Sequence, residues 1–249
     1  MDPLTPEPTS SPGRVLISGG ASGLGRAVAE AVRAAGGTPV VLDLSVAPGG
    51  GDASSTTGDS KGIDAEAVDV ADTRAAEAAV QRAAQRHGGL DAVFTAAGID
   101  YPAPFESLAG EAWERVVAVN LLGTAAIVRA ALPYLRASPR GTVVTCASTL
   151  GLKAVSDATA YCASKWGVVG FTRALAAELR GQVRVTLLVP GGMETAFFDQ
   201  RAEQYKPPAN AKLNHPAHVA AAVMYALRQP PGCELRELVV ASSHEESWP

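Results

Sequence analysis

The 249-residue sequence is short of basic residues, cysteines, aromatic side chains and long apolar runs. Its 21 Lys and Arg residues are outnumbered by 25 Asp and Glu residues, and the two signs are mixed along the chain, so no basic stripe predicts a nucleic-acid partner. We expect no stretch apolar enough over roughly 18 residues to span a membrane, and therefore no membrane partner. A small molecule is the expected ligand.

The three cysteines, Cys146, Cys162 and Cys233, are odd in number and show no metal-ligand spacing, which fits a reducing cytoplasmic setting and predicts no metal site. Residues 1–12 are rich in Pro, Ser and Thr and lack a basic start, so we expect a disordered tail rather than a secretion signal. Residues 13–249 contain no linker, and 47% of the chain is apolar, which favours one domain.

Short apolar runs alternate with longer helical patterns from Arg14 onward. This alternation predicts an α/β fold, with a three-layer, doubly wound sheet of about seven parallel strands and helices on both faces. We expect strands at 14–18, 38–43, 65–68, 90–95, 141–146, 182–189 and 237–241, and helices at 24–35, 73–87, 111–137, 159–180 and 216–228. The Gly- and Ser-rich residues 47–62 predict a flexible loop, and the irregular, aromatic residues 194–215 predict a substrate lid.

A glycine-rich turn joins the first expected strand to the first helix. Gly19, Gly23 and Gly25 lie in the sequence SGGASGLG, where glycines allow a sharp turn and a close approach to a pyrophosphate. The free amides and the helix dipole at such a turn favour an anion. A tight structural turn is the alternative, but the strand before it and the helix after it favour a dinucleotide site.

Asp43 ends the second expected strand, about 20 residues beyond the glycines. A carboxylate at this point accepts hydrogen bonds from both ribose hydroxyls and repels a 2′-phosphate, so it favours NAD over NADP. Neither Ser22 nor Leu44 supplies a cation for an additional phosphate. Asp69, after the third strand, is a candidate for the adenine amino group, with a turn or helix cap as the alternative.

Tyr161 and Lys165 are four residues apart in an expected helix and therefore share one face. A phenol is a poor base at neutral pH, but a nearby cation stabilises the phenolate. Ser148, thirteen residues before Tyr161, ends a strand and could hold a substrate oxygen. Asn120 is polar in an apolar helix, so it either satisfies a local backbone group or orders a water beside Lys165.

These motifs together resemble the short-chain dehydrogenase/reductase family, in its single-domain form of roughly 250 residues, from Arg14 to about Ala241. The resemblance implies that Asn120, Ser148, Tyr161 and Lys165 are the catalytic set. Where the family often has Asn-Asn-Ala-Gly, this chain has Thr95-Ala96-Ala97-Gly98, which removes amide side chains but keeps the backbone contact. The residues and the resemblance together assign cofactor contacts to Ser18, Gly19, Ser22, Gly23, Leu24, Gly25, Asp43, Leu44, Asp69, Val70, Ala97, Gly98, Tyr161, Lys165, Pro190, Gly191, Met193 and Thr195.

The sequence thus predicts an NAD-dependent oxidoreductase acting on an alcohol or ketone carbon of a secondary alcohol, hydroxyacyl or steroid-like substrate. The family also implies a homo-oligomer, as a tetramer or dimer. A non-catalytic NAD sensor or scaffold is the alternative on the same fold. A serine hydrolase is disfavoured, because no Gly-x-Ser-x-Gly motif surrounds Ser148.

Overall fold

The computed structural model describes residues 11–46, 63–245 and 247. The described chain forms one seven-stranded sheet in the order β3-β2-β1-β4-β5-β6-β7, and every neighbouring pair is parallel. The strands are β1 (Arg14–Ser18), β2 (Thr38–Asp43), β3 (Asp64–Ala67), β4 (Ala92–Thr95), β5 (Thr142–Cys146), β6 (Arg184–Pro190) and β7 (Glu237–Val240). The predicted α/β fold is confirmed, with strand ends that differ from the expected ones by at most two residues.

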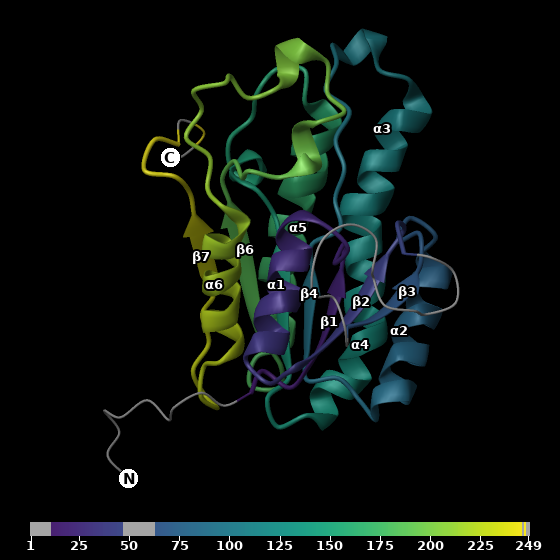
Figure 1. Ribbon diagram of the computed structural model, residues 1–249. Coiled ribbons are helices and arrows are strands. Elements are labelled where there is room, and N and C mark those ends of the chain that lie inside the picture. The colour runs from purple at the N-terminus through teal and green to yellow at the C-terminus, as the bar shows by residue number, and fades with distance from the viewer. Residues whose placement is uncertain (1–10, 47–62, 246, 248–249) are drawn as a thin grey trace.

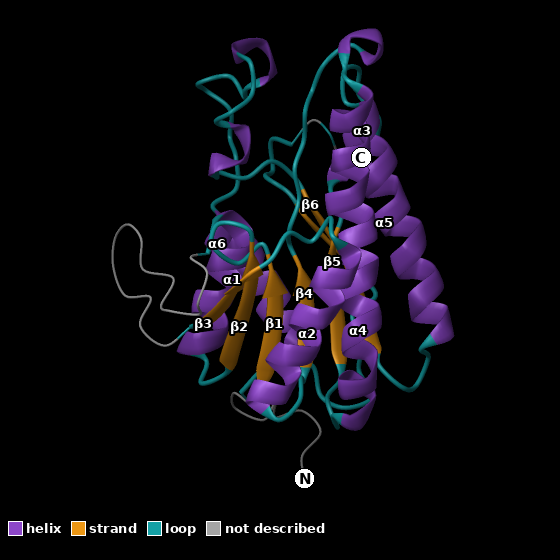
Figure 2. Cartoon of the chain, turned by 90° about the vertical axis from the view of Figure 1, so that its right-hand side faces the viewer, coloured by secondary structure: helices purple, strands orange, loops and turns teal. Residues whose placement is uncertain are grey.

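Helices cover both faces of the sheet, as Figures 1 and 2 show. One face carries α1 (Gly23–Ala34) and α6 (Pro216–Leu227). The other carries α2 (Thr73–His87), α4 (Thr124–Ala137) and α5 (Thr159–Glu178). Every strand between two helical layers is buried on both faces, which explains why the central strands are almost continuously apolar.

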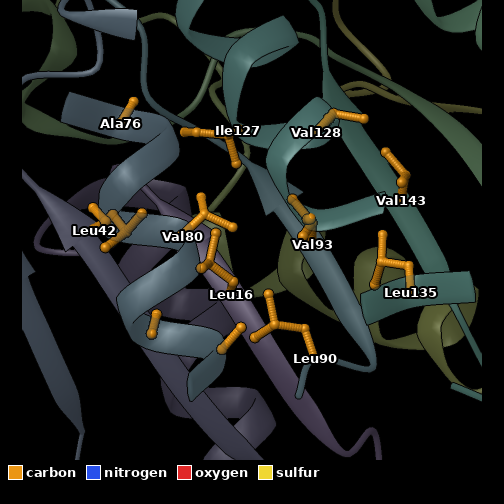
Figure 3. Packing of buried hydrophobic residues seen from close by; sticks show 14 of the residues in the cluster. Leu16, Leu42, Ala76, Val80, Leu90, Val93, Ile127, Val128, Leu135 and Val143 are labelled. Atoms are coloured by element: carbon orange, nitrogen blue, oxygen red, sulfur yellow. The ribbon is translucent and has the colours of Figure 1, made fainter. Parts of the chain in front are cut away.

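The larger core cluster lies between the sheet and helices α2 and α4. Figure 3 shows Leu16 and Val93 of the sheet packed against Val80 of α2 and Ile127 of α4. All four side chains are fully buried. Burial of a side chain of this size contributes about 1.5–3 kcal/mol, so this layer holds the strands, and the loops that follow them, in fixed positions.

The expected single helix over 111–137 is interrupted. It consists of α3 (Gly110–Val117), a π-helical turn (Ala118–Gly123) and α4, and the turn contains Asn120. π-helical turns are rare and often mark functional sites. The most apolar 18-residue window of this run, Gly110–Ala137, has a mean hydropathy of 1.7, so by length and composition alone one stretch is more apolar than we expected; a core helix of a globular protein passes the same test. Half of its most apolar window is buried inside the fold.

Two expected segments fall wholly or partly outside the described residues. They are the whole of the expected loop 47–62 and residues 1–10 of the expected tail 1–12. Ser11 and Pro12, which we placed in the tail, belong to the packed fold: the Ser11 hydroxyl donates to the Gly36 carbonyl at 2.8 Å, and Pro12 is buried.

The strand order reverses at β1: strands β2 and β3 lie on one side of it, and the chain then returns to place β4 on its other side. β1 pairs with β2 on one side and with β4 on the other, although β4 follows β3 in sequence. In open parallel sheets the loops diverge at such a point and leave a crevice at the carboxyl ends of the strands. The glycine turn and the segments that follow β4, β5 and β6 all lie at this edge.

Candidate active site

The glycine turn has the tight geometry that its sequence predicts. Gly19 and Gly23 have φ angles of +72° and +51°, which other residues rarely adopt. A Cβ on Gly25 would lie 2.1 Å from the Gly19 carbonyl oxygen, so only glycine fits there. Ser22 precedes α1 and makes no side-chain cap hydrogen bond, and Leu24 is buried in the first turn.

Asp43 lies at the end of β2, directly beside this turn. One carboxylate oxygen accepts a hydrogen bond from the Ala21 amide at 3.0 Å, and the other accepts from the Ser45 amide at 2.8 Å. The carboxylate therefore braces the glycine turn and its own loop, and both oxygens keep lone pairs for a further donor. Leu44 beside it is largely exposed.

Asp69 lies one strand further out, and its side chain already has two partners. It accepts from the Ala71 amide at 3.0 Å and forms an ion pair with Arg115 of α3 at 2.8 Å. Partial burial alone would raise the pKa of Asp69, but the hydrogen bonds from Arg115 and Ala71 lower it. Val70 is buried, and a Cβ on Gly123 would lie 2.7 Å from its carbonyl oxygen. The cap of α2 is Asp72, as its hydrogen bonds to the Arg74 and Ala75 amides show.

Asn120 holds the segment that follows β4. Its side-chain oxygen accepts from the Ile99 amide at 2.8 Å, while its amide donates to the Ile99 carbonyl at 3.0 Å and to the Ser164 hydroxyl at 2.9 Å. Of the two roles expected for Asn120, the structure shows the backbone role. A Cβ on Gly98 would lie 3.4 Å from the Asn120 side-chain oxygen and 3.5 Å from Lys165 Nζ, so these three residues meet at one point.

The Ala96-Ala97-Gly98 segment also touches the glycine turn. The Ala97 amide lies 3.5 Å from the Ser18 hydroxyl, at the limit of a hydrogen bond. A Cβ on Gly19 would lie 2.6 Å from the Ala97 nitrogen. The first turn and the end of β4 are therefore in direct backbone contact, as a shared cofactor crevice requires.

Tyr161 and Lys165 are buried on one face of α5. Lys165 Nζ lies 5.6 Å from the centre of the Tyr161 ring and donates to the Cys146 carbonyl at 2.9 Å. Burial raises the pKa of Tyr161, and a hydrogen bond with Ser148 opposes this shift. Burial lowers the pKa of Lys165. Ser148 lies two residues beyond the end of β5 and also accepts a hydrogen bond from the Leu150 amide at 3.1 Å.

The segment after β6 is held by residues near the carboxyl terminus. Glu245 accepts from the Gly192 amide at 2.8 Å and lies against Gly191, which follows Pro190. Met193 forms a parallel bridge with Asn214, which closes the base of segment 194–215. A Cβ on Gly23 would lie 3.4 Å from Thr195 Cγ2, so this segment reaches the glycine turn.

Segment 194–215, the expected lid, lies over Tyr161 and is attached at three points. The Phe197 ring lies 5.8 Å from the Tyr161 ring, centre to centre. The Tyr205 hydroxyl donates to Asp157 at 3.0 Å, and Arg201 forms an ion pair with Asp100 at 2.8 Å. His215, at the end of the segment, accepts from the Ala217 amide and caps α6. Surface hollows of about 550 and 420 Å³ border Thr195, and Tyr161 lines neither of them.

These residues fit a nicotinamide dinucleotide. Glycines with positive φ leave an open cradle at the start of α1, where amide groups and the helix dipole suit a pyrophosphate. Asp43 supplies acceptors next to that cradle for ribose hydroxyls. Among the described residues, Lys165 Nζ donates a hydrogen bond to the Cys146 carbonyl, and its other N–H groups are left for hydroxyl groups of a ligand.

A family profile described as short chain dehydrogenase matches residues 14–206. The chain belongs to the short-chain dehydrogenase family. It is therefore an oxidoreductase of the dehydrogenase type, and dehydrogenases of this family use nicotinamide cofactors.

Curated relatives cover most of the chain. A D-threitol dehydrogenase from Mycolicibacterium smegmatis is 32% identical over 217 residues, which are 84% of each protein. A 2-dehydro-3-deoxy-L-rhamnonate dehydrogenase (NAD(+)) from a Sphingomonas species is 36% identical over 190 residues, which are 74% of each. Among solved structures, an alcohol dehydrogenase from Thermococcus sibiricus, complexed with 5-hydroxy-NADP, has a TM-score of 0.80 at 23% identity, and the match covers 94% of this chain and 98% of the other.

Sequence reasoning missed four charged residues at this edge. Arg115 pairs with Asp69, Glu245 holds Gly192, and Asp100 pairs with Arg201. Asp100 directly follows the Ala97-Gly98-Ile99 segment, and this position is the one feature of the sequence that could have placed it near the site. The other partners come from distant parts of the chain, and no local pattern marks them.

Proposed function

We propose that this chain catalyses the reversible, NAD-dependent oxidation of a secondary alcohol to a ketone, with Tyr161 as the acid/base. The observation that carries the proposal is that Lys165 Nζ lies near both the Tyr161 ring and Gly98, at the sheet edge that also holds the glycine turn. The names of two relatives, a D-threitol dehydrogenase and a 2-dehydro-3-deoxy-L-rhamnonate dehydrogenase (NAD(+)), support an alcohol substrate.

In the proposed oxidation, the Tyr161 phenolate removes the hydroxyl proton of the substrate, and Ser148 holds the same oxygen by a hydrogen bond. Bound NAD supplies the hydride acceptor and a positive charge near the phenol. Burial disfavours the phenolate, so Tyr161 needs cations close by to become a base. The chain itself provides two such cations: Lys165, which lies 5.6 Å from the centre of the ring, and Arg201, whose charge lowers the pKa of Tyr161.

Asn120 acts as a positioning residue in this proposal. It bonds both backbone groups of Ile99 and the Ser164 hydroxyl, so it fixes the end of β4 relative to α5. This arrangement holds Gly98 beside Lys165. A shift of about 1 Å in such a site can lower a rate by about 100-fold.

NAD is the proposed cofactor because Asp43 would face a 2′-phosphate with a negative charge. Its oxygens already accept from two backbone amides, which keeps the carboxylate at the glycine turn. Charge repulsion there disfavours NADP. The relative whose name includes NAD(+) supports the same choice.

The test is an absorbance assay of NADH formation with a panel of secondary alcohols, run in parallel with NADP. The proposal expects turnover with NAD and a loss of about 100-fold or more in Tyr161→Phe, with unchanged NAD binding by fluorescence titration. Normal turnover in Tyr161→Phe would remove Tyr161 from the mechanism. NAD binding with no turnover on any alcohol or ketone would favour the sensor or scaffold alternative.

We also propose that the chain forms a homo-oligomer, as a dimer or tetramer. We further propose that it works in a reducing, cytoplasmic compartment. Trp166 of α5 and Leu122 of the π-helical turn are 50% and 49% exposed, and they offer apolar surface for an interface between subunits. The three cysteines are free. Light scattering should give a mass above that of one chain, and Trp166→Glu should lower it; a wild-type mass of one chain would contradict the oligomer.

A further inference from the structure

The carboxyl-terminal end of the described chain turns back onto the segment that follows β6. The Glu245 amide donates to the Ser242 carbonyl at 2.9 Å, which closes a turn after β7. This turn brings the Glu245 carboxylate to Gly192, whose amide donates to Oε2 at 2.8 Å. A Cβ on Gly191 would overlap the same oxygen, so glycine at this position lets the carboxylate approach the backbone.

The other oxygen of Glu245 is connected to the segment that follows β5. The Ser247 hydroxyl donates to Glu245 Oε1 at 2.5 Å. The hydroxyls of Ser247 and Thr149 are hydrogen-bonded at 2.7 Å. Thr149 is buried and directly follows Ser148, the proposed holder of the substrate oxygen. One carboxylate therefore links the segments after β5 and β6 through hydrogen bonds.

The Glu245 side chain is held as a carboxylate. Burial alone would raise its pKa, but the hydrogen bonds from Ser247 and the Gly192 amide lower it. An ionised carboxylate accepts at both oxygens, and hydrogen bonds to a charged group are stronger than those between neutral groups. Glu245 can therefore hold Gly192 and Ser247 at the same time.

The two linked segments lie at one end of the proposed cofactor crevice. Asp43, the proposed ribose ligand, ends β2, whereas Ser148 follows β5, and the sheet order places the glycine turn after β1 between them. A dinucleotide with one ribose at Asp43 and its pyrophosphate at the glycine turn therefore extends toward β5 and β6. Its nicotinamide ring must reach Ser148 and Tyr161, which places the Gly191–Gly192 segment at the nicotinamide end.

We propose that Glu245 is a positioning residue that fixes the nicotinamide end of the cofactor site, by holding the Gly191–Gly192 segment in place relative to the segment of Ser148. This role rests on the proposed NAD-dependent function. In the described part of the chain, the side-chain bonds of Glu245 go to Gly192 and Ser247, not to the glycine turn or Asp43. Loss of Glu245 should therefore weaken binding of the nicotinamide half of NAD and spare the adenosine diphosphate half.

Paired binding measurements test this division. We would measure the Kd of NAD and of ADP-ribose, which lacks the nicotinamide, for the wild type, Glu245→Ala and Glu245→Gln. Glu245→Ala should weaken NAD binding by about tenfold and leave the Kd of ADP-ribose unchanged. Glutamine keeps an acceptor for the Gly192 amide, so Glu245→Gln should regain most of the NAD affinity. Equal weakening of both ligands would make Glu245 a structural residue only, and unchanged NAD affinity in Glu245→Ala would also overturn the proposal.

Ser247→Ala and Ser243→Ala form a matched pair, because each removes one hydroxyl near Glu245. Ser247 joins Glu245 to Thr149, whereas the exposed Ser243 hydroxyl lies 3.3 Å from His244 Nδ1. Ser247→Ala should lower kcat for NADH formation by about tenfold, because the segment of Ser148 is no longer held, and Ser243→Ala should keep the wild-type kcat. Melting temperatures verify that each variant is folded. Equal kcat values in the two variants would contradict the link to Thr149.

The binding comparison separates this role from the proposed function, because it does not depend on turnover. If the wild type binds NAD but oxidises no alcohol, the dehydrogenase proposal fails, and the two Kd values still decide the role of Glu245. A wild type that binds neither NAD nor ADP-ribose would overturn both proposals.

Discussion

Two aspartates flank the same strand, β4, and their surroundings differ. At the amino end, Asp91 accepts from the Arg14 amide at 2.8 Å, from the Arg14 guanidinium at 2.9 Å and from the Ser138 hydroxyl at 2.7 Å. At the carboxyl end, Asp100 has its ion pair with Arg201, and one oxygen has no partner in the described part of the chain. One carboxylate is saturated by protein groups and the other is not.

The pKa values of the two carboxyls follow this difference in hydrogen bonding, because the pKa is lowered at Asp91 and raised at Asp100. Burial acts to raise both, but the hydrogen bonds from Arg14 and Ser138 lower the pKa of Asp91 to about 2. Burial outweighs Arg201 at Asp100, whose pKa is raised. The difference teaches that the carboxylate at the amino end of the sheet is fully used in hydrogen bonds that stabilise the fold, whereas the buried carboxylate at the carboxyl end keeps an oxygen without a partner among the described residues.

The largest expected effect is on activity at the carboxyl end. Lys165→Met should lower turnover by about 100-fold or more, because it removes the cation that favours the Tyr161 phenolate. Methionine fills a similar buried volume, and the loss of a buried charge need not destabilise the fold. We therefore expect a low initial rate together with a melting temperature close to that of the wild type. A large fall in the melting temperature would mean that Lys165 stabilises the fold, which would contradict the contrast between the two ends of the sheet.

At the amino end the expected effect is on stability. Asp91→Asn removes the charge from a side chain that is 12% exposed and leaves Arg14 with weaker bonds. The free energy of unfolding should fall by about 2 kcal/mol, measured by urea denaturation, with little change in KM or kcat. Lost activity in a folded variant would show that this end also serves the chemistry.

The contribution of Asp91 to the free energy of unfolding should depend on pH, which gives a second test of its role at the amino end of the sheet. Because the pKa of Asp91 is lowered in the folded state, its contribution is complete above the unfolded value of 3.8 and is lost as the pH falls toward about 2. The difference in unfolding free energy between wild type and Asp91→Asn should therefore shrink from pH 5 to pH 3. A constant difference would mean that the charge of Asp91 is unimportant.

The smallest expected effect concerns cofactor choice. Asp43→Asn keeps one acceptor for the Ala21 amide but removes the charge proposed to repel a 2′-phosphate. The ratio of kcat/KM for NAD to that for NADP should fall by about tenfold, which corresponds to about 1.4 kcal/mol. An unchanged ratio would indicate that other residues select the cofactor.

Local sequence patterns were sufficient to predict the strands of the sheet, because its buried strands are short apolar runs and the turn after β1 carries diagnostic glycines. They were also sufficient to place Tyr161, Lys165 and Ser148 at one edge, since parallel strands end together. They did not predict the π-helical turn at Asn120, which coincides with side-chain bonds to Ile99 and Ser164. Asp100 and Arg201 lie 101 residues apart, and only the folded chain brings them together.

The most direct test of the account compares Tyr161→Phe with Asp91→Asn in the same two assays, NADH formation and thermal unfolding. We predict that Tyr161→Phe loses turnover by about 100-fold or more and keeps the wild-type melting temperature, while Asp91→Asn loses stability and keeps turnover. If Tyr161→Phe retained wild-type turnover, or if both variants lost activity and stability together, the division between the two ends of the sheet would be contradicted.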